Sequence, residues 1–120
     1  MDKQRVAGWV LSAIPGLMLG SGGINTMLKM PFVMEGLVKY RYPDGAAVGM
    51  GLAAFSSAVL YLIPRTAMVG AILLTGYLGG ATATHVRAGE PWFFPVIFGV
   101  LVWVGLVMRD AKVRAAVRFK

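Results

Sequence analysis

The chain has 120 residues, of which 58% are hydrophobic and only 14% are charged, and its mean hydropathy is +0.70. Soluble domains carry about a quarter charged residues, so this composition excludes an ordinary soluble domain. The formal net charge is +7, but nucleic-acid binders gather their cations on one face of a soluble fold. Here the cations lie between and after long apolar blocks, which is typical of membrane loops and excludes nucleic acid as the expected partner.

The apolar blocks predict an all-α integral membrane protein. Crossing a bilayer takes roughly 20 apolar residues as a helix, because every backbone polar group in lipid must be paired within its segment. The sequence therefore predicts a four-helix bundle, a single transmembrane domain over residues 1–120. Its helices are expected at about residues 6–28, 46–63, 66–86 and 92–108, followed by a basic tail at 109–120.

The second and third blocks meet at Pro64 and Arg65. Proline disfavours helix at the preceding Ile63, and an arginine is costly inside lipid. We expect a tight turn at a membrane surface, so that these two helices form an antiparallel hairpin.

The distribution of Lys and Arg predicts the orientation. With four crossings, eight cations share the side of the two termini, against four on the other: Lys3, Arg5, Arg65, Arg109, Lys112, Arg114, Arg118 and Lys120, against Lys29, Lys39, Arg41 and Arg87. The positive-inside rule then places both termini in the cytoplasm. An alternative is that Lys3, Arg5 and the apolar run form a signal peptide; because the run continues to Met27, we favour a retained first helix.

Two flanking segments are expected at the membrane interface. Residues 31–43 have apolar side chains near helical spacing between two prolines, which predicts a short interfacial helix; a hydrated loop is the alternative. The basic tail is expected to form a helix against anionic lipid headgroups.

Small residues recur four apart along the apolar blocks. Three such pairs, Gly16 and Gly20, Gly45 and Gly49, Gly76 and Gly80, predict close helix packing. The third block is richest in glycine and alanine, and we expect it at the centre of the bundle.

The acidic residues exclude one class of transporter. Small proton-coupled drug exporters need a carboxylate buried in the membrane, yet all the acids here lie near the ends of the apolar blocks: Asp2, Glu35, Asp44, Glu90 and Asp110. The chain has no cysteine and one histidine, so neither a metal site nor a catalytic triad is expected. No cofactor motif is evident, and a redox role would need a bound group such as a quinone, or a partner protein.

The densest group of reactive side chains follows the third block. Helical spacing is expected to put Thr75, Thr82 and His85 on one face, with Tyr77 on another. Histidine exchanges protons near neutral pH, so His85 is a candidate catalytic residue. Glu90, which follows it closely in sequence, and Asn25, which is expected on the same membrane side, are the other two candidates. Candidate substrate-binding residues are Lys29, Arg87, Thr82 and Trp103. The alternative is that this group only caps a helix and hydrates a turn, with Trp103 in the bundle core.

Three stretches carry a family resemblance. Leu-Tyr-Leu-Ile-Pro-Arg-Thr at 60–66, residues 70–91 ending in His-Val-Arg-Ala-Gly-Glu-Pro, and residues 101–110 resemble the DoxX-like membrane proteins. The resemblance covers most of the chain from about Lys29. It implies a bacterial four-helix protein of the inner membrane. The family is named after a subunit linked with thiosulfate:quinone oxidoreductase, and other members are associated with oxidative-stress complexes.

Two functions follow as hypotheses, and whether the chain is an enzyme stays open between them. The first is an accessory subunit of a quinone-linked oxidoreductase system, with membrane lipid and an oxidoreductase or a second copy of the chain as partners. The alternative is a small enzyme that acts on an apolar lipid or isoprenoid by proton transfer at His85. A cavity bordered by His85 and Asn25 would favour the enzyme, and tight packing there would favour the accessory subunit.

Overall fold

The computed structural model describes residues 2–43 and 45–117. Asp44 and two cations of the orientation count, Arg118 and Lys120, lie outside the described residues. The described chain is all-α, which confirms the predicted fold class. It contains six helices: α1 (Lys3–Met27), α2 (Pro31–Lys39), α3 (Ala46–Leu62), α4 (Ala67–Ala88), α5 (Phe93–Arg109) and α6 (Ala111–Val117).

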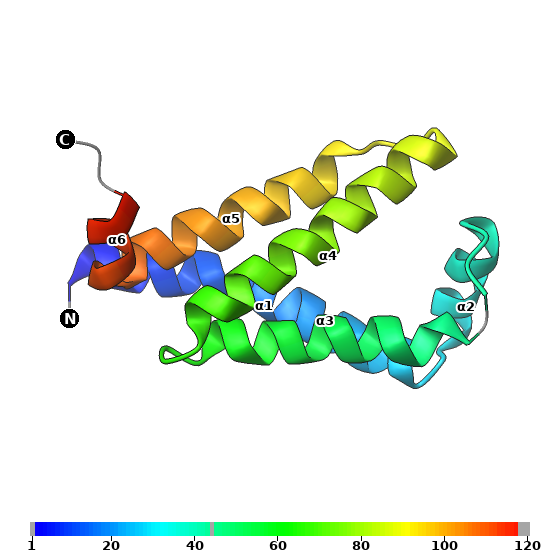
Figure 1. The fold of residues 1–120 in the computed structure, drawn as a ribbon, viewed down its shortest axis with the longest axis horizontal. Helices are drawn as coiled ribbons and strands as arrows, with labels where there is room; N and C mark the ends of the chain where they lie inside the picture. The colour runs from blue at the N-terminus through cyan, green and yellow to red at the C-terminus, as the bar shows by residue number, and fades with distance from the viewer. Residues whose placement is uncertain (1, 44, 118–120) are drawn as a thin grey trace.

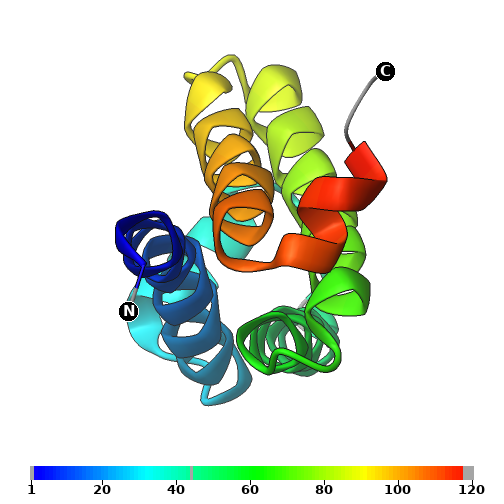
Figure 2. The same ribbon diagram turned by 90° about the vertical axis from the view of Figure 1, so that its left-hand side faces the viewer.

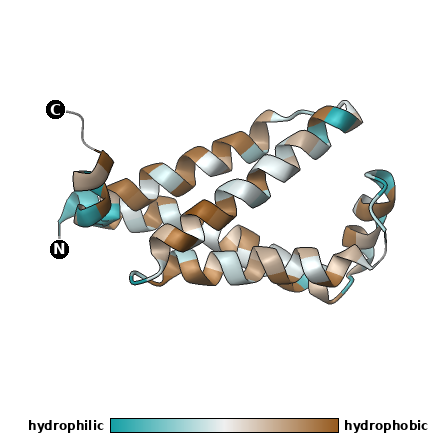
Figure 3. Ribbon diagram, in the orientation of Figure 1, coloured by the Kyte–Doolittle hydropathy of each residue, from teal (hydrophilic) through white to brown (hydrophobic). Residues whose placement is uncertain are grey.

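Four of these helices are the predicted apolar blocks. By length and composition, α1 and α4 can cross a membrane, and α5 with the bent α6 makes a third candidate span. The remaining apolar helix, α3, has 17 residues and rises roughly 26 Å, slightly less than a typical hydrocarbon core. Large apolar side chains cover the outside of the bundle, including Leu17, Ile72 and Val100. So much exposed apolar surface suits lipid rather than water. Figure 3 shows that hydrophobic residues recur along the length of the four long helices.

Local sequence explains where the first two helices begin and end. The Asp2 side chain caps α1 by accepting a hydrogen bond from the Gln4 amide at 2.9 Å. Beyond α1, Lys29 has a φ of 55°, which ends the helix. Pro31 starts α2, as predicted. However, α2 ends at Lys39, before Pro43, because Arg41 has a left-handed φ of 64°.

The predicted hairpin joins α3 to α4. Ile63 is extended, as a residue before proline should be, and the Thr66 hydroxyl donates to the Leu60 carbonyl at 2.8 Å. Gly70 allows the start of α4 to lie against the backbone of Tyr61, where any side chain would collide. The turn is therefore fixed by proline on one side and by a close helix contact on the other.

Two further turns shape the second half of the chain. Gly89 ends α4 with a left-handed φ of 72°, and the chain returns as α5. Asp110 breaks α5 from α6, which is bent by 110° relative to α5, so α6 lies across the end of the bundle (Figure 1).

The four apolar helices form a ring in which α1 packs on α3 and α5, and α4 packs on the same two (Figure 2). We call the end that holds Asp2, Pro64 and Arg109 the basal end, and the end that holds Tyr40, His85 and Glu90 the distal end. The α4–α5 pair diverges from the α1–α3 pair toward the distal end (Figure 1). The core is thus concentrated away from the distal end.

The glycine pattern predicted the packing only in part. Gly16 lies against Leu62, and a side-chain carbon on Gly20 would be 3.6 Å from Ala58, as expected for close approach. In contrast, no atom lies within 4 Å of the corresponding position on Gly45, Gly49 or the pair in α4. The prediction that α4 occupies the centre is wrong, because the four helices surround a shared core and none lies inside it.

Candidate functional site

A cavity of about 420 Å³ lies at the distal end. It is lined by side chains from α1, α2, α3, α4 and the segment after α2: Thr26, Val33, Gly36, Leu37, Tyr40, Tyr42, Met50, Gly76, Tyr77, Gly80, Ala81, Thr84 and His85. The cavity is mostly apolar, with a few hydroxyl groups and one imidazole, a composition typical of small-molecule sites.

Missing side chains on α4 and α2 create this space. Gly76 and Gly80 are one helical turn apart on the wall of the cavity, and Gly36 faces it from α2. A side-chain carbon built on any of the three would meet no atom within 4 Å. These glycines therefore leave room where larger residues would fill the gap between the diverging helix pairs.

His85 is half-buried in the cavity wall. Its Nδ1 lies 2.7 Å from the Ala81 carbonyl oxygen, and its ring lies 5.6 Å from the ring of Tyr40. Because a carbonyl only accepts, Nδ1 carries the hydrogen in this contact. In a neutral ring Nε2 then has a free lone pair. His85 can therefore accept a hydrogen bond or a proton from a bound molecule.

Glu90 ties the end of α4 to the end of α2. One carboxylate oxygen accepts a hydrogen bond from the Tyr40 hydroxyl, and the other forms an ion pair with Lys39. The hydrogen bonds from Lys39 and then Tyr40 hold the pKa of Glu90 below its usual value. The same hydrogen bonds raise the pKa of Lys39 and that of Tyr40. We call this group, Lys39, Tyr40 and Glu90, the distal latch.

A second connection runs beside the latch. The hydroxyl groups of Tyr42 and Thr84 lie 2.5 Å apart, and Thr84 also donates to the Gly80 carbonyl at 2.9 Å. Arg87 donates to the Tyr40 carbonyl at 3.3 Å and lies 5.9 Å from the centre of the Tyr42 ring. Polar contacts thus close the outer rim of a cavity whose interior is apolar.

The predicted catalytic residues occupy different positions around this site. His85 lines the cavity, whereas Glu90 belongs to the latch and contacts the cavity only through Tyr40. Asn25 is half-buried near the end of α1 but is outside the lining, where its neighbour Thr26 contributes instead. The predicted cavity bordered by His85 and Asn25 therefore exists on the His85 side only.

The predicted substrate-binding residues also separate. Arg87 lies at the rim, and Lys29 is exposed beyond α1, outside the lining. Thr82 and Trp103 line a shallow groove between α4 and α5, where Trp103 donates to the Thr75 hydroxyl at 2.7 Å. The prediction that Thr75, Thr82 and His85 share a face is wrong.

The grouping failed because His85 lies on the helix between two faces. At 3.6 residues per turn, His85 is about as close around the helix axis to Tyr77 as to Thr75. In the structure its ring contacts Tyr40, and it lines the same cavity as Tyr77. Within residues 2–43 and 45–117, no three His, Asp or Glu side chains come together as metal ligands.

Sequence reasoning missed three tyrosines of the cavity. Tyr40 and Tyr42 belong to the segment expected at the membrane interface, and Tyr77 was expected on a different face of its helix from His85, yet all three line the site. The sequence carries no signal for this role, because tyrosine is common at membrane interfaces.

Comparisons with known proteins agree with this architecture. No curated protein and no solved structure matches the chain. A family description does match, over residues 10–105, and this range includes α2, the distal cavity, the latch and most of α5. The match covers well over half of the chain, and the protein belongs to the DoxX-like family.

Proposed function

We propose that this protein binds a small amphiphilic molecule of the quinone or isoprenoid class in the distal cavity. In this proposal it serves as an accessory membrane subunit of a quinone-linked oxidoreductase system. The observation that carries the binding role is the cavity of about 420 Å³, a size within the usual range for small-molecule sites. Membership of the DoxX-like family supports the oxidoreductase context.

The polar groups in the cavity favour a ligand with oxygen atoms on a ring. His85 offers an acceptor at Nε2, because Nδ1 is held by the Ala81 carbonyl. Tyr77 offers a hydroxyl donor, with no hydrogen-bond partner among the described side chains. A quinone presents acceptor oxygens, which suit the Tyr77 hydroxyl. Its reduced form presents hydroxyl donors, which suit Nε2 of His85. Val33 and Leu37 supply apolar contacts for a hydrocarbon tail.

Orientation is part of the proposal. The excess of cations at the basal end supports placing both termini in the cytoplasm, which puts the distal cavity in the outer leaflet. Because the chain has no cysteine, single cysteines report topology without further changes. Glu35→Cys should react with a membrane-impermeant maleimide added to intact spheroplasts, and Lys112→Cys should react only after lysis; the reverse pattern would invert the orientation.

Ligand binding is tested by mass spectrometry of lipids that remain with the purified protein. The wild-type protein should retain a quinone or isoprenoid compound. Gly80→Leu places a large side chain at the cavity wall, where its first carbon meets no atom within 4 Å, and should lose the ligand. Ala83→Leu, at an exposed position on the same helix, should keep it. Equal retention by both variants would disprove binding at this site.

A second candidate is an enzyme that uses the same site. The observation that favours it is the free Nε2 lone pair of His85 in the wall of a mostly apolar cavity, where it can take a proton from a bound molecule. His85→Gln separates the two roles, because glutamine forms hydrogen bonds but does not transfer protons near neutral pH. An enzyme would retain ligand and lose turnover. An accessory subunit would instead co-purify with an oxidoreductase in mild detergent, in the variant as in the wild type.

A further inference from the structure

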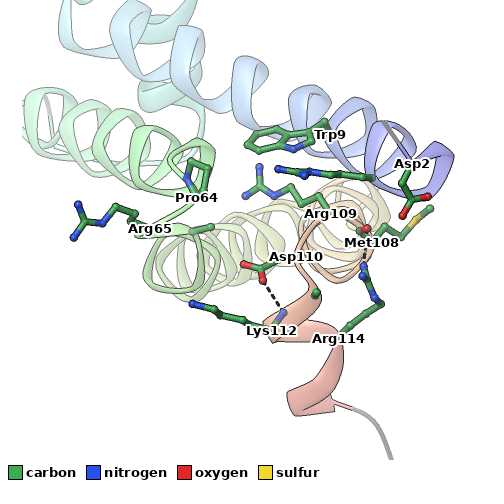
Figure 4. A pocket seen from close by; sticks show the side chains of 12 residues that line it. Asp2, Trp9, Pro64, Arg65, Met108, Arg109, Asp110, Lys112 and Arg114 are labelled. Carbon is green, nitrogen blue, oxygen red and sulfur yellow. Dashed lines mark hydrogen bonds between the residues drawn. The ribbon is translucent and has the colours of Figure 1, made fainter.

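A second cavity, of about 590 Å³, lies at the basal end. Cationic side chains dominate its lining, which includes Arg5, Arg65, Arg109, Lys112 and Arg114. Figure 4 labels the cations from the α3–α4 turn, α5 and α6 around this cavity, together with Trp9 of α1. Three parts of the chain that are distant in sequence thus contribute positive charge to its lining.

Arg109 is the most buried of these cations. Only 8% of its surface is exposed, and its guanidinium group lies between two aromatic rings, 4.1 Å from the centre of Trp9 and 4.5 Å from that of Tyr61. Its Nη2 donates to the Tyr61 carbonyl. Its Nη1 is buried and has no hydrogen-bond partner among the described residues. A buried cation without an ion-pair partner is unfavourable, and negative charge in the adjacent cavity would offset that cost.

The two carboxylates of this cavity do not supply that acceptor. Asp2 accepts from the Gln4 amide at the start of α1. Asp110 accepts from the Lys112 amide at 2.9 Å and so starts α6. Neither forms an ion pair within residues 2–43 and 45–117. The carboxylates are therefore used as helix caps, and the cavity keeps a positive balance.

We infer that the basal cavity binds a phosphate group, and that its occupant is the headgroup of an anionic phospholipid. Arginine and lysine bind phosphate through charge-assisted hydrogen bonds, and side chains of both types line this cavity. Basic pockets between membrane helices are suited to anionic headgroups. This site is distinct from the distal cavity and does not depend on the function proposed for it.

The apolar outer face of α1 favours lipid over a soluble phosphate compound. Val10, Ile14 and Leu17 are exposed on this face, and Val10 directly follows Trp9, which lines the basal cavity. A phospholipid whose phosphate lies in the cavity can place an acyl chain against this apolar face. A soluble anion would make no use of it.

The test uses the whole protein in nanodiscs of phosphatidylcholine with or without phosphatidylglycerol. Native mass spectrometry should show preferential retention of phosphatidylglycerol, together with a higher unfolding temperature. The double variant Arg65→Gln with Lys112→Gln should reduce the affinity for phosphatidylglycerol roughly tenfold or more. Both side chains are exposed, so unfolding in phosphatidylcholine alone should not change.

Lys3→Gln is the matched control, because it removes a charge at the same end but outside the cavity lining. It should leave the affinity within about twofold, as expected for a surface charge. Equal retention of the two lipids by the wild type, or equal affinity in the double variant, would overturn the inference. Stabilisation by inorganic phosphate without any lipid preference would support the anion site and overturn the phospholipid as its occupant.

Discussion

Two regions of the bundle use glycine in opposite ways. At the basal contact of α1 with α5, Gly8 and Gly105 allow the helices to touch, since a side-chain carbon on Gly8 would lie 2.6 Å from the Arg109 amide nitrogen. Gly23 and Gly51 do the same between α1 and α3. On the distal half of α4, by contrast, Gly76 and Gly80 face open space and line a cavity. The same residue type thus permits close contact where two helices converge and leaves space where α4 diverges from its neighbours.

Charge differs between the ends as well. The distal latch pairs Lys39 with Glu90 across two segments. At the basal end, Arg109 is buried against aromatic rings with one nitrogen unpartnered, while the nearby acids cap helices. The distal latch is therefore an ion pair with further polar contacts beside it, whereas the basal end is closely packed and retains the capacity to bind an anion.

The largest expected effect is at the basal helix contact. In Gly105→Ala the new carbon would lie 2.5 Å from the Ser12 hydroxyl oxygen and 2.9 Å from its amide nitrogen. Forcing α1 and α5 apart should lower the free energy of unfolding by about 3 kcal/mol, measured by unfolding in mixed micelles. Gly99→Ala on the same helix is the control, because its nearest neighbour is a Leu78 methyl carbon at 4.0 Å. Equal stability of the two variants would mean that the basal end is not closely packed.

Removing the buried arginine should have the next largest effect. Arg109→Ala loses the hydrogen bond to the Tyr61 carbonyl and the contacts with two rings. A charged hydrogen bond of this kind contributes about 2 kcal/mol, and thermal unfolding should register the loss. Arg65→Ala, at an exposed position, should change stability by less than about 0.5 kcal/mol. A stability loss equal to that of Arg65→Ala would show that Arg109 does not hold the basal helices together.

Acidification should open the distal latch. Because the folded pKa of Glu90 lies below its usual value, its contribution is complete above the usual glutamate range and is lost as the pH falls through the lowered value. The raised pKa values of Lys39 and Tyr40 give the converse, a contribution lost as the pH rises beyond their usual values near 10.

Hydrogen exchange of residues 36–42 measures this opening. Glu90→Gln should exchange faster than the wild type at neutral pH, and the difference should vanish at low pH. Glu35→Gln, an exposed change on α2, should match the wild type throughout. A constant difference between Glu90→Gln and the wild type at every pH would show that the carboxylate charge is not what holds the latch.

The smallest expected effect is a gain at the distal end. Gly80→Ala adds a methyl group with no atom within 4 Å, and alanine favours helix over glycine by about 0.8–1 kcal/mol. The variant should unfold at a slightly higher temperature. A loss of stability in Gly80→Ala comparable to that in Gly105→Ala would show that Gly80 is as closely packed as Gly105.

Much of the fold could be predicted from the sequence. The apolar block lengths predicted α1, α3, α4 and α5, because lipid tolerates only segments that pair their own backbone groups. Pro31 and Pro64 predicted the start of α2 and the hairpin turn. His85, chosen as the one imidazole beside polar neighbours, lines the distal cavity, and its catalytic role stays a prediction.

The contacts that form the sites could not be predicted in the same way. Tyr40 meets His85 and Glu90 from about fifty residues away, and no local pattern specifies which helix end α2 approaches. Asn25 was chosen because it lies on the same predicted membrane side as His85, yet the side chain that reaches the cavity is that of Thr26.

The sequence by itself determined the class of protein, the helices and their turns, since these depend on hydrophobic length and on backbone preferences within a few residues. Only the tertiary structure decided which glycines pack and which leave space, and that Arg109 is buried between Trp9 and Tyr61. The physical reason is that a glycine or an arginine acquires its role from the neighbour opposite it, and that neighbour is set by how the helix pairs converge at one end and diverge at the other.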